Sequence, residues 1–119
     1  MAKEGFQVLA PYEAAADLSA DQYKIVAIDA AEKIDLAGAG LGSGILIDDP
    51  ALGQNGSVCV SGYAKVVAAG AINAGVRFTA DASGLAVAAV ATNLVIGMTL
   101  REAAAANQVI ECIVAPSTF

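Results

Sequence analysis

Histidine and tryptophan are absent from this sequence of 119 residues, and tyrosine and phenylalanine occur only three times each. Without histidine the chain lacks the residue on which Ser-His-Asp triads, Cys-His dyads and most zinc sites depend. Basic residues are also few, since six Lys and Arg stand against twelve Asp and Glu, for a net charge of −6. They are scattered, whereas a protein that binds nucleic acid clusters its basic side chains. We therefore expect no catalytic triad and no nucleic-acid partner.

The residues that are present suit a single folded domain. The apolar class makes up 57% of the chain, with 28 Ala and 30 Val, Ile or Leu. That content excludes a disordered chain, and a domain near this size buries roughly two-thirds of its unfolded surface. The charge is uneven, because residues 1–49 carry nine acidic and three basic side chains and residues 50–119 carry three of each. The first part is expected to present a solvated acidic face.

The two cysteines are expected to stay unpaired. Between Ser57 and Ser61, alternation places Cys59 on the outward face with the serines, whereas Cys112 falls on the inward face with Ile110. One outward and one inward thiol do not form a bridge. The N-terminus has no apolar run of the signal-peptide type, and both features favour an intracellular origin.

Residues 82–100 contain no charged side chain, and this window approaches the length of a bilayer crossing. Small and polar residues interrupt it, and no basic cluster flanks it. Two buried strands are expected there, and no membrane partner.

Short β-type runs separated by Gly, Asn and Asp dominate the chain. Strands are expected at 23–28, 33–36, 44–47, 57–61, 63–67, 76–80, 85–88, 94–102 and 109–114. Asn55-Gly56 and residues 81–84 have the composition of hairpin turns, and Gly62 permits a kink. Alternation in the sixth run directs Phe78 inward and Thr79 outward. This spacing predicts an all-β fold, a small sandwich or barrel-like domain of the β-tulip type with at most one or two short helical turns.

Residues 1–21 show no sustained periodicity, and they are expected to form an N-terminal arm ahead of a β-rich domain over residues 22–119. Within the arm, Phe6, Leu9 and Tyr12 are spaced by three residues around Pro11. Two interpretations stay open: a loosely packed terminus, or an arm that becomes ordered against another subunit through these three side chains. Deletion of residues 1–12 is then expected to leave the domain folded.

The sequence contains only weak matches to the motifs of nucleotide binding, calcium binding and catalysis. The Gly-rich segment 38–44 lacks the spacing of a dinucleotide fingerprint and is expected to be a flexible connection, and Asp48-Asp49 lacks the EF-hand pattern. No Ser-x-x-Lys arrangement occurs. We expect no enzyme activity, no cofactor and no metal ion.

A series of short apolar and Gly-containing motifs runs through residues 20–115. Its members are Lys33–Leu36, Gly44–Ile47, Val58–Val66, Ala69–Gly75, Phe78–Gly84, Ile96–Leu100 and Val109–Val114. Their order resembles that of the small capsid decoration (cement) proteins of tailed bacteriophages. The resemblance implies a structural virion protein, made in the host cytoplasm, that binds the major capsid protein on the outer surface of the assembled capsid. It implies a homotrimer at three-fold or quasi-three-fold positions that stabilises the shell, with no catalytic residues.

Phe6, Leu9 and Tyr12 are the candidate contacts with the capsid or with another subunit. Two other functions stay open at this point. One is a small ligand-binding β-barrel, although the scarcity of aromatic residues disfavours stacking on sugars. The other is a tail or fibre component of the same kind of particle.

Overall fold

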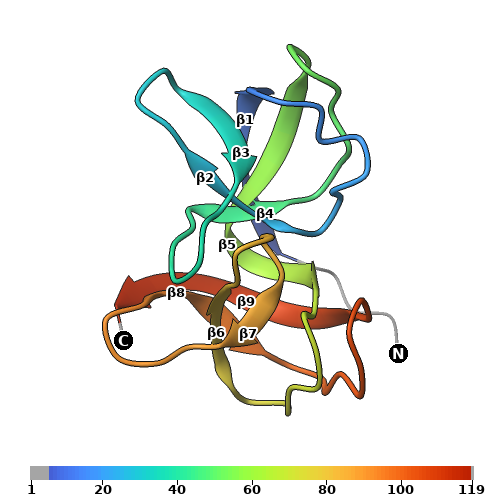
Figure 1. The fold of residues 1–119 in the computed structure, drawn as a ribbon, viewed down its shortest axis with the longest axis vertical. Helices are drawn as coiled ribbons and strands as arrows, with labels where there is room; N and C mark the ends of the chain where they lie inside the picture. The colour runs from blue at the N-terminus through green and yellow to red at the C-terminus, as the bar shows by residue number, and fades with distance from the viewer. Residues whose placement is uncertain (1–5, 119) are drawn as a thin grey trace.

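The computed structural model describes residues 6–118, which form nine β-strands and no helix (Figure 1). The strands are β1 (Gln7–Ala14), β2 (Ile25–Ile28), β3 (Lys33–Leu36), β4 (Gly44–Leu46), β5 (Asn55–Val67), β6 (Arg77–Ala80), β7 (Ala86–Ala88), β8 (Leu94–Thr99) and β9 (Val109–Thr118). They make one sheet in the order β1-β3-β2-β4-β5-β9-β8-β6-β7. The all-β prediction is confirmed, and residues 82–100 contain two strands as expected. Across residues 6–118, no helix has the length and apolarity to cross a bilayer.

The first half of the sheet closes into a barrel of five strands, the upper half of Figure 1. β1 is bonded to β3 on one side and to β5 on the other, and β2 and β4 complete the ring. Six buried side chains form its core cluster: Ala14, Leu18, Val26, Ile34, Leu46 and Val58. Burial of each large aliphatic side chain contributes about 1.5–3 kcal/mol. The barrel is therefore held together by a packed apolar core.

The second half is built on the same long strand. β5 pairs with β1 and β4 up to Gly62, and with β9 from Gly62 to Val67. In the sheet, β9 is followed by β8, β6 and β7. An isolated bridge between Ala68 and Ala86 joins β7 to the residue that follows β5. A second buried cluster, which includes Phe78, extends to Ile25 and Ile45 on the first barrel. The two halves thus share a strand and a core.

The segment that was expected to be an arm contains a strand of the first barrel. Gln7–Ala14 is β1, which pairs with β5 from Gln7 to Glu13, and Leu18 after it is buried in the barrel core. The expectation of a loosely packed terminus is wrong for residues 7–14, because these residues supply the strand that closes the ring. Met1–Gly5 lie outside the described residues.

Asn55-Gly56 was predicted to be a turn, and this is wrong. Both residues begin β5, where they pair with Glu13 and Tyr12 of β1. The turn lies just before them, where the Gln54 amide donates to the carbonyl of Ala51 (2.9 Å). The dipeptide is extended because the neighbouring strand is present to bond to it.

Alternation assigned two side chains to the wrong face. Cys59 was expected outward but is buried, because β5 is covered on both faces: Val58 belongs to the barrel cluster and Cys59 to the larger cluster. Thr79 was also expected outward and is buried, since β6 is a central strand covered on both faces from Phe78 to Ala80. Cys59 and Cys112 are free thiols, as predicted.

The Gly-rich segment 38–44 connects the two halves closely. The Gly40 amide donates to the carbonyl of Ala80, and the Gly40 carbonyl accepts a hydrogen bond from the Leu94 amide, both at 2.9 Å. A Cβ at Gly42 would lie 2.6 Å from the Ile96 side chain. The glycines therefore permit close contact between β8 and the connection that leads into β4.

Candidate docking surface

Large apolar side chains form a row across the outer face of the second half, in which Ile113 and Met98 are exposed and Tyr63 is partly buried. Tyr63 on β5 lies opposite Ile113 on β9, and Ile113 lies opposite Met98 on β8. Side chains directly opposite each other in antiparallel strands share a face. Ile113 is 39% exposed and Met98 is 40% exposed, whereas the flanking Cys112 and Val114 are buried in the core. The alternation of β9 therefore directs Ile113 to the solvent.

Phe6, the residue directly before β1, extends this row. Its carbonyl accepts a hydrogen bond from the amide of Tyr63 (2.6 Å), and the side-chain amide of Gln7 donates to the carbonyl of Tyr63 (2.8 Å). The side chain of Phe6 is 75% exposed. We call Phe6, Tyr63, Ile113 and Met98 the apolar row. It runs from the start of β1 across β5, β9 and β8, which the topology brings side by side.

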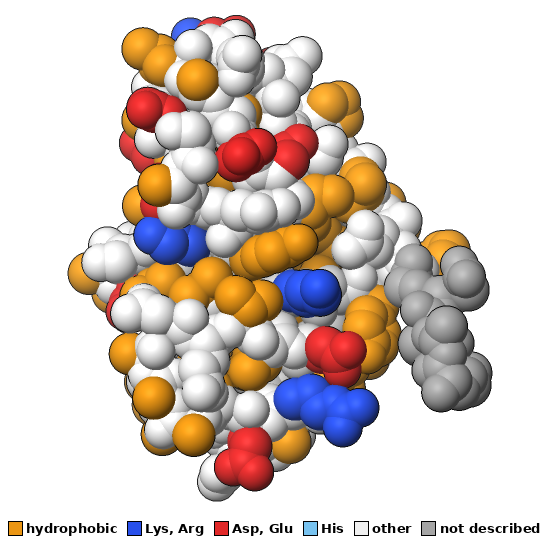
Figure 2. All heavy atoms as spheres, turned by 90° about the vertical axis from the view of Figure 1, so that its right-hand side faces the viewer, with side chains coloured by type: hydrophobic (Ala, Val, Ile, Leu, Met, Phe, Trp, Pro, Cys, Tyr) orange, Lys and Arg blue, Asp and Glu red, His pale blue; other side chains and the backbone are white. Residues whose placement is uncertain are grey.

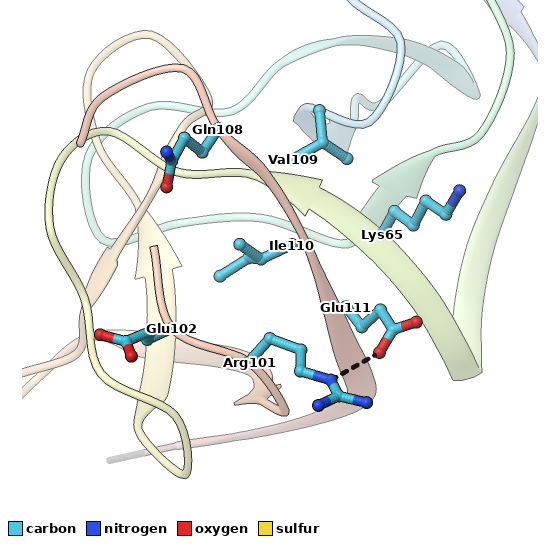
Figure 3. Close-up of a pocket in the computed structure, with 7 residues that line it drawn as sticks. All are labelled: Lys65, Arg101, Glu102, Gln108, Val109, Ile110 and Glu111. Carbon is cyan, nitrogen blue, oxygen red and sulfur yellow. Dashed lines mark hydrogen bonds and ion pairs between the residues drawn. The ribbon is translucent and has the colours of Figure 1, made fainter. Parts of the chain in front are cut away.

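A polar cluster adjoins the row (Figure 3). The Nε atom of Arg101 donates to Oε1 of Glu111 (3.1 Å), and the hydroxyl of Tyr63 also bonds to this carboxylate. These two donors, Arg101 more strongly, hold the pKa of Glu111 below its usual value. The bond to Glu111 in turn raises the pKa of Tyr63. Lys65 lies opposite Glu111 on β5, with its Nζ atom 5.9 Å from the ring centre of Tyr23.

An open hollow of about 640 Å³ lies beside this cluster (Figure 3). Its lining consists of Lys65, Arg101, Glu102, Gln108, Val109, Ile110 and Glu111. A second hollow of about 450 Å³ shares Arg101 and Glu102 with it. Among residues 6–118, no group of three or more His, Cys, Asp or Glu is arranged to hold a metal ion. The hollows present charged ends and apolar carbon side by side, which is a surface composition suited to contact with another protein.

Charge is segregated between the two halves. Residues 6–49 contain eight acidic and two basic side chains, and residues 50–118 contain three of each. Lys65 and Arg101 belong to the polar cluster, and Arg77 lies opposite Met98. Figure 2 shows a face on which apolar side chains gather in a band at mid-height, with basic and acidic side chains beside and below it. The row thus has both basic and acidic groups around it, while residues 6–49 carry the excess of acidic side chains.

The three candidate contact residues do not form one cluster. Phe6 lies in the row, and Leu9 is exposed opposite Cys59. Tyr12 is half-buried and packs against the barrel core. Successive side chains of a strand point to opposite faces, so a spacing of three residues separates neighbouring members. Sequence reasoning missed Tyr63, Ile113 and Met98, although the alternation of β9 could have indicated Ile113.

Residues 6–118 contain no helix, and their two halves, built on one strand, present an apolar row among charged groups, which is suited to contact with a partner protein. The family model described as phage cement protein matches residues 4–114, and the chain belongs to this family. The resemblance noted from the motifs is confirmed. Membership implies a structural protein of the phage virion that is associated with the capsid.

A solved structure has the same fold. The crystal structure of the head fibre gp8.5 N base of bacteriophage phi29 matches with a TM-score of 0.74 and 19% sequence identity, over 96% of this chain and 98% of that one. At this identity the match shows the fold alone. No curated protein sequence matches the chain.

Proposed function

We propose that the chain is a decoration protein that binds the outer surface of the assembled capsid as a homotrimer at three-fold or quasi-three-fold positions. It contacts the major capsid protein, stabilises the shell and performs no catalysis. The observation that carries the proposal, within the cement family, is the apolar row. Four large side chains on one face, bordered by charges, make the kind of surface that partner proteins cover.

A second set of exposed apolar side chains supports the proposal that the protein binds two kinds of partner. Leu41, Val90 and Leu94 form what we call the loop patch. The Leu94 amide bonds to Gly40, next to Leu41, and the Asn93 amide bonds to the carbonyl of Val90 (3.1 Å). Leu41 and Val90 lie on connections and Leu94 begins β8, whereas Tyr63, Ile113 and Met98 of the row lie within strands. A decoration protein needs one surface for its own copies and another for the shell, and these two groups would supply them.

The physical effect on the shell follows from selective binding. A protein that binds only the assembled shell stabilises it by mass action, by roughly 2.7 kcal/mol per site at a hundredfold excess over Kd. Three linked copies raise the effective concentration at each remaining contact, so weak individual contacts suffice. A trimer would carry 3 × −6 = −18 charges, which keeps free copies soluble.

Co-sedimentation with empty cognate shells tests the proposal. The chain should pellet with the shells in a saturable manner and should raise their thermal disruption temperature. Unassembled major capsid protein is the matched control, and it should not retain the chain. Absence of the chain from the shell pellet at micromolar concentration would exclude the proposed function.

A further inference from the structure

We infer that copies of this chain associate through the face that contains the loop patch, and that this face is turned towards the three-fold axis of the proposed homotrimer. The inference rests on the proposed function and names the surface at which a second copy binds. We call residues 38–41, 82–84 and 90–94 the uncharged face, because none of them is Asp, Glu, Lys or Arg. Its large exposed side chains are those of the loop patch, with Val90 exposed by 62% and Leu41 by 53%.

Backbone contacts join the three segments of the uncharged face. The Gly40 carbonyl accepts a hydrogen bond from the Leu94 amide at the start of β8 (2.9 Å). The Gly84 carbonyl accepts from the Ile25 amide (2.8 Å), and the Ile25 carbonyl accepts from the amide of Ala37, the residue before the first segment (3.0 Å). The β3–β4 and β7–β8 connections, which carry the first and third segments, both lie at the left of Figure 1, whereas Figure 2 faces its right-hand side.

The uncharged face is a neutral region on a chain with a net charge of −6. Residues 36–47 and 82–100 contain no charged side chain. Asp81 adjoins the face, but its Oδ1 atom accepts hydrogen bonds from the amides of Ser83 (2.8 Å) and Leu85 (2.9 Å). This carboxylate is therefore turned towards the backbone of its own loop.

A neutral face suits a contact between identical copies. Close to a symmetry axis, each side chain faces the same side chain of the neighbouring copies, so a charged group there meets its own sign, which is unfavourable. The cores of protein interfaces are accordingly depleted of charged residues. The row does not meet this condition, because Lys65, Glu111 and Arg101 lie beside it. Its mixed charges suit a partner with a different surface, and the row is thus left for the shell.

The turn that carries Val90 is held in a fixed conformation. The Asn93 amide donates to the carbonyl of Val90 (3.1 Å), and the Val90 amide donates to Oδ1 of Asn93 (2.9 Å). Thr92 within this turn has a φ of +75°, which β-branched residues rarely adopt and which persists only where the surroundings impose it. Because the turn is already ordered by these bonds, little conformational freedom is lost when a second copy covers Val90.

Small residues surround the side chains of the loop patch. Gly38, Ala39, Ala82 and Ala91 are all exposed. Dispersion attraction falls steeply with distance, and short side chains let the backbone of a second copy approach closely. The composition of the face therefore permits close packing around the loop patch.

Light-scattering mass in solution tests the inference. The wild-type chain should have the mass of three chains. Val90→Asp and Val90→Lys should each have the mass of one chain, because either charge would meet its own sign at the axis. Val90→Thr, an uncharged variant of similar shape, is the matched control and should keep the wild-type mass. Ile113→Asp on the row should also keep that mass, but it should no longer pellet with cognate shells.

Four results would overturn the inference: a wild-type chain without the mass of three chains, a Val90→Asp variant that stays trimeric, a Val90→Lys variant that stays trimeric when Val90→Asp does not, or an Ile113→Asp variant that dissociates. The third would show that an acidic surface of the neighbouring copy faces Val90, and the fourth that the row joins the copies. Far-UV circular dichroism verifies folding, and Leu41→Asp replaces Val90→Asp if that variant unfolds.

Shell co-sedimentation separates the two proposals. A wild-type trimer that Val90→Asp dissociates but that does not bind shells ends the proposed function alone. A chain that binds shells and is monomeric in solution ends this inference alone.

Discussion

The carbonyl oxygen of Phe6 lies against the α-carbon of Gly62 and accepts a hydrogen bond from the amide of Tyr63 at 2.6 Å. Gly62 has a φ of +109°, a conformation that L side chains rarely adopt, and a Cβ there would overlap the Phe6 carbonyl. β5 passes from the first barrel to the second half at this residue while β1 stays bonded to it. The junction of the two halves therefore depends on a glycine.

Gly62→Ala should lower the free energy of unfolding by about 3 kcal/mol, since backbone strain and a steric overlap with fixed backbone act together. Gly53→Ala is the control, because Gly53 has a φ of +82° but no atom within 4 Å of its added Cβ. It should cost only about 1 kcal/mol. Urea unfolding measures both, and equal losses would show that the contact with Phe6 does not matter.

Two buried threonines should respond in opposite directions to replacement by valine. The hydroxyl of Thr79 has no hydrogen-bond partner within residues 6–118, whereas that of Thr99 donates to the carbonyl of Asn73 (2.7 Å) and accepts from the amide of Val76 (3.1 Å). Thr79→Val should stabilise the protein by about 1 kcal/mol, and Thr99→Val should destabilise it by about 1–3 kcal/mol. Thermal unfolding monitors the difference. A destabilised Thr79→Val would mean that this hydroxyl is bonded.

Substitution of two phenylalanines should distinguish a core position from a surface position. Phe78 is fully buried in the larger core cluster, so Phe78→Ala should cost about 3–5 kcal/mol. Phe6→Ala should change the free energy of unfolding by less than about 0.5 kcal/mol, because this side chain is exposed. Chemical denaturation at one fixed protein concentration measures both variants against the wild-type chain. A cost under 1 kcal/mol at Phe78 would contradict the assignment of the core.

Stability should fall at alkaline pH because of the buried thiols. Burial raises the pKa of Cys112 to about 12, with the neighbouring Cys59 as the lesser cause. The unfolded thiol ionises near pH 9.0 while the folded one keeps its proton, so stability is retained below pH 9.0 and is lost as pH rises towards 12. The slope for one such group reaches about 1.4 kcal/mol per pH unit. Cys112→Ala should flatten this slope between pH 9 and 11, and an unchanged slope would refute the role of the thiol.

Deletion of residues 1–12 should unfold the first barrel rather than release an arm. The deletion removes Gln7–Tyr12, which is most of the strand that joins β3 to β5. Hydrogen exchange should show loss of protection in β2 and β3, and the thermal transition should broaden. A truncated chain with the wild-type melting temperature would show that the barrel does not need β1.

The local sequence pattern predicts most of the strands. It does not predict which faces of those strands are covered by other segments of the chain. The alternation around Phe78 and Cys112 indicates their inward faces correctly, because a strand repeats every two residues. It fails at Cys59 and Thr79, where both faces of the strand are covered by segments distant in the chain. β1 was missed because its partners on β5 lie some fifty residues away and its exposed side chains do not alternate.

The candidate surface could be anticipated only in part. Phe6 was named from the sequence, but the other members of the row come from β5, β8 and β9. Their proximity depends on strand register, which the order of motifs does not determine. The polar cluster around Glu111 likewise joins residues from β5, β9 and the segment that follows β8. A site of this kind becomes visible once the pairing is known.

The most direct test of the account is a cryo-electron microscopy difference map between cognate shells with and without the bound chain. The account predicts added density on the outer surface, centred on three-fold or quasi-three-fold positions and matching three copies of the two-part fold. Shells that carry the chain at the tail or inside, or that show no added density at saturating concentration, would contradict it.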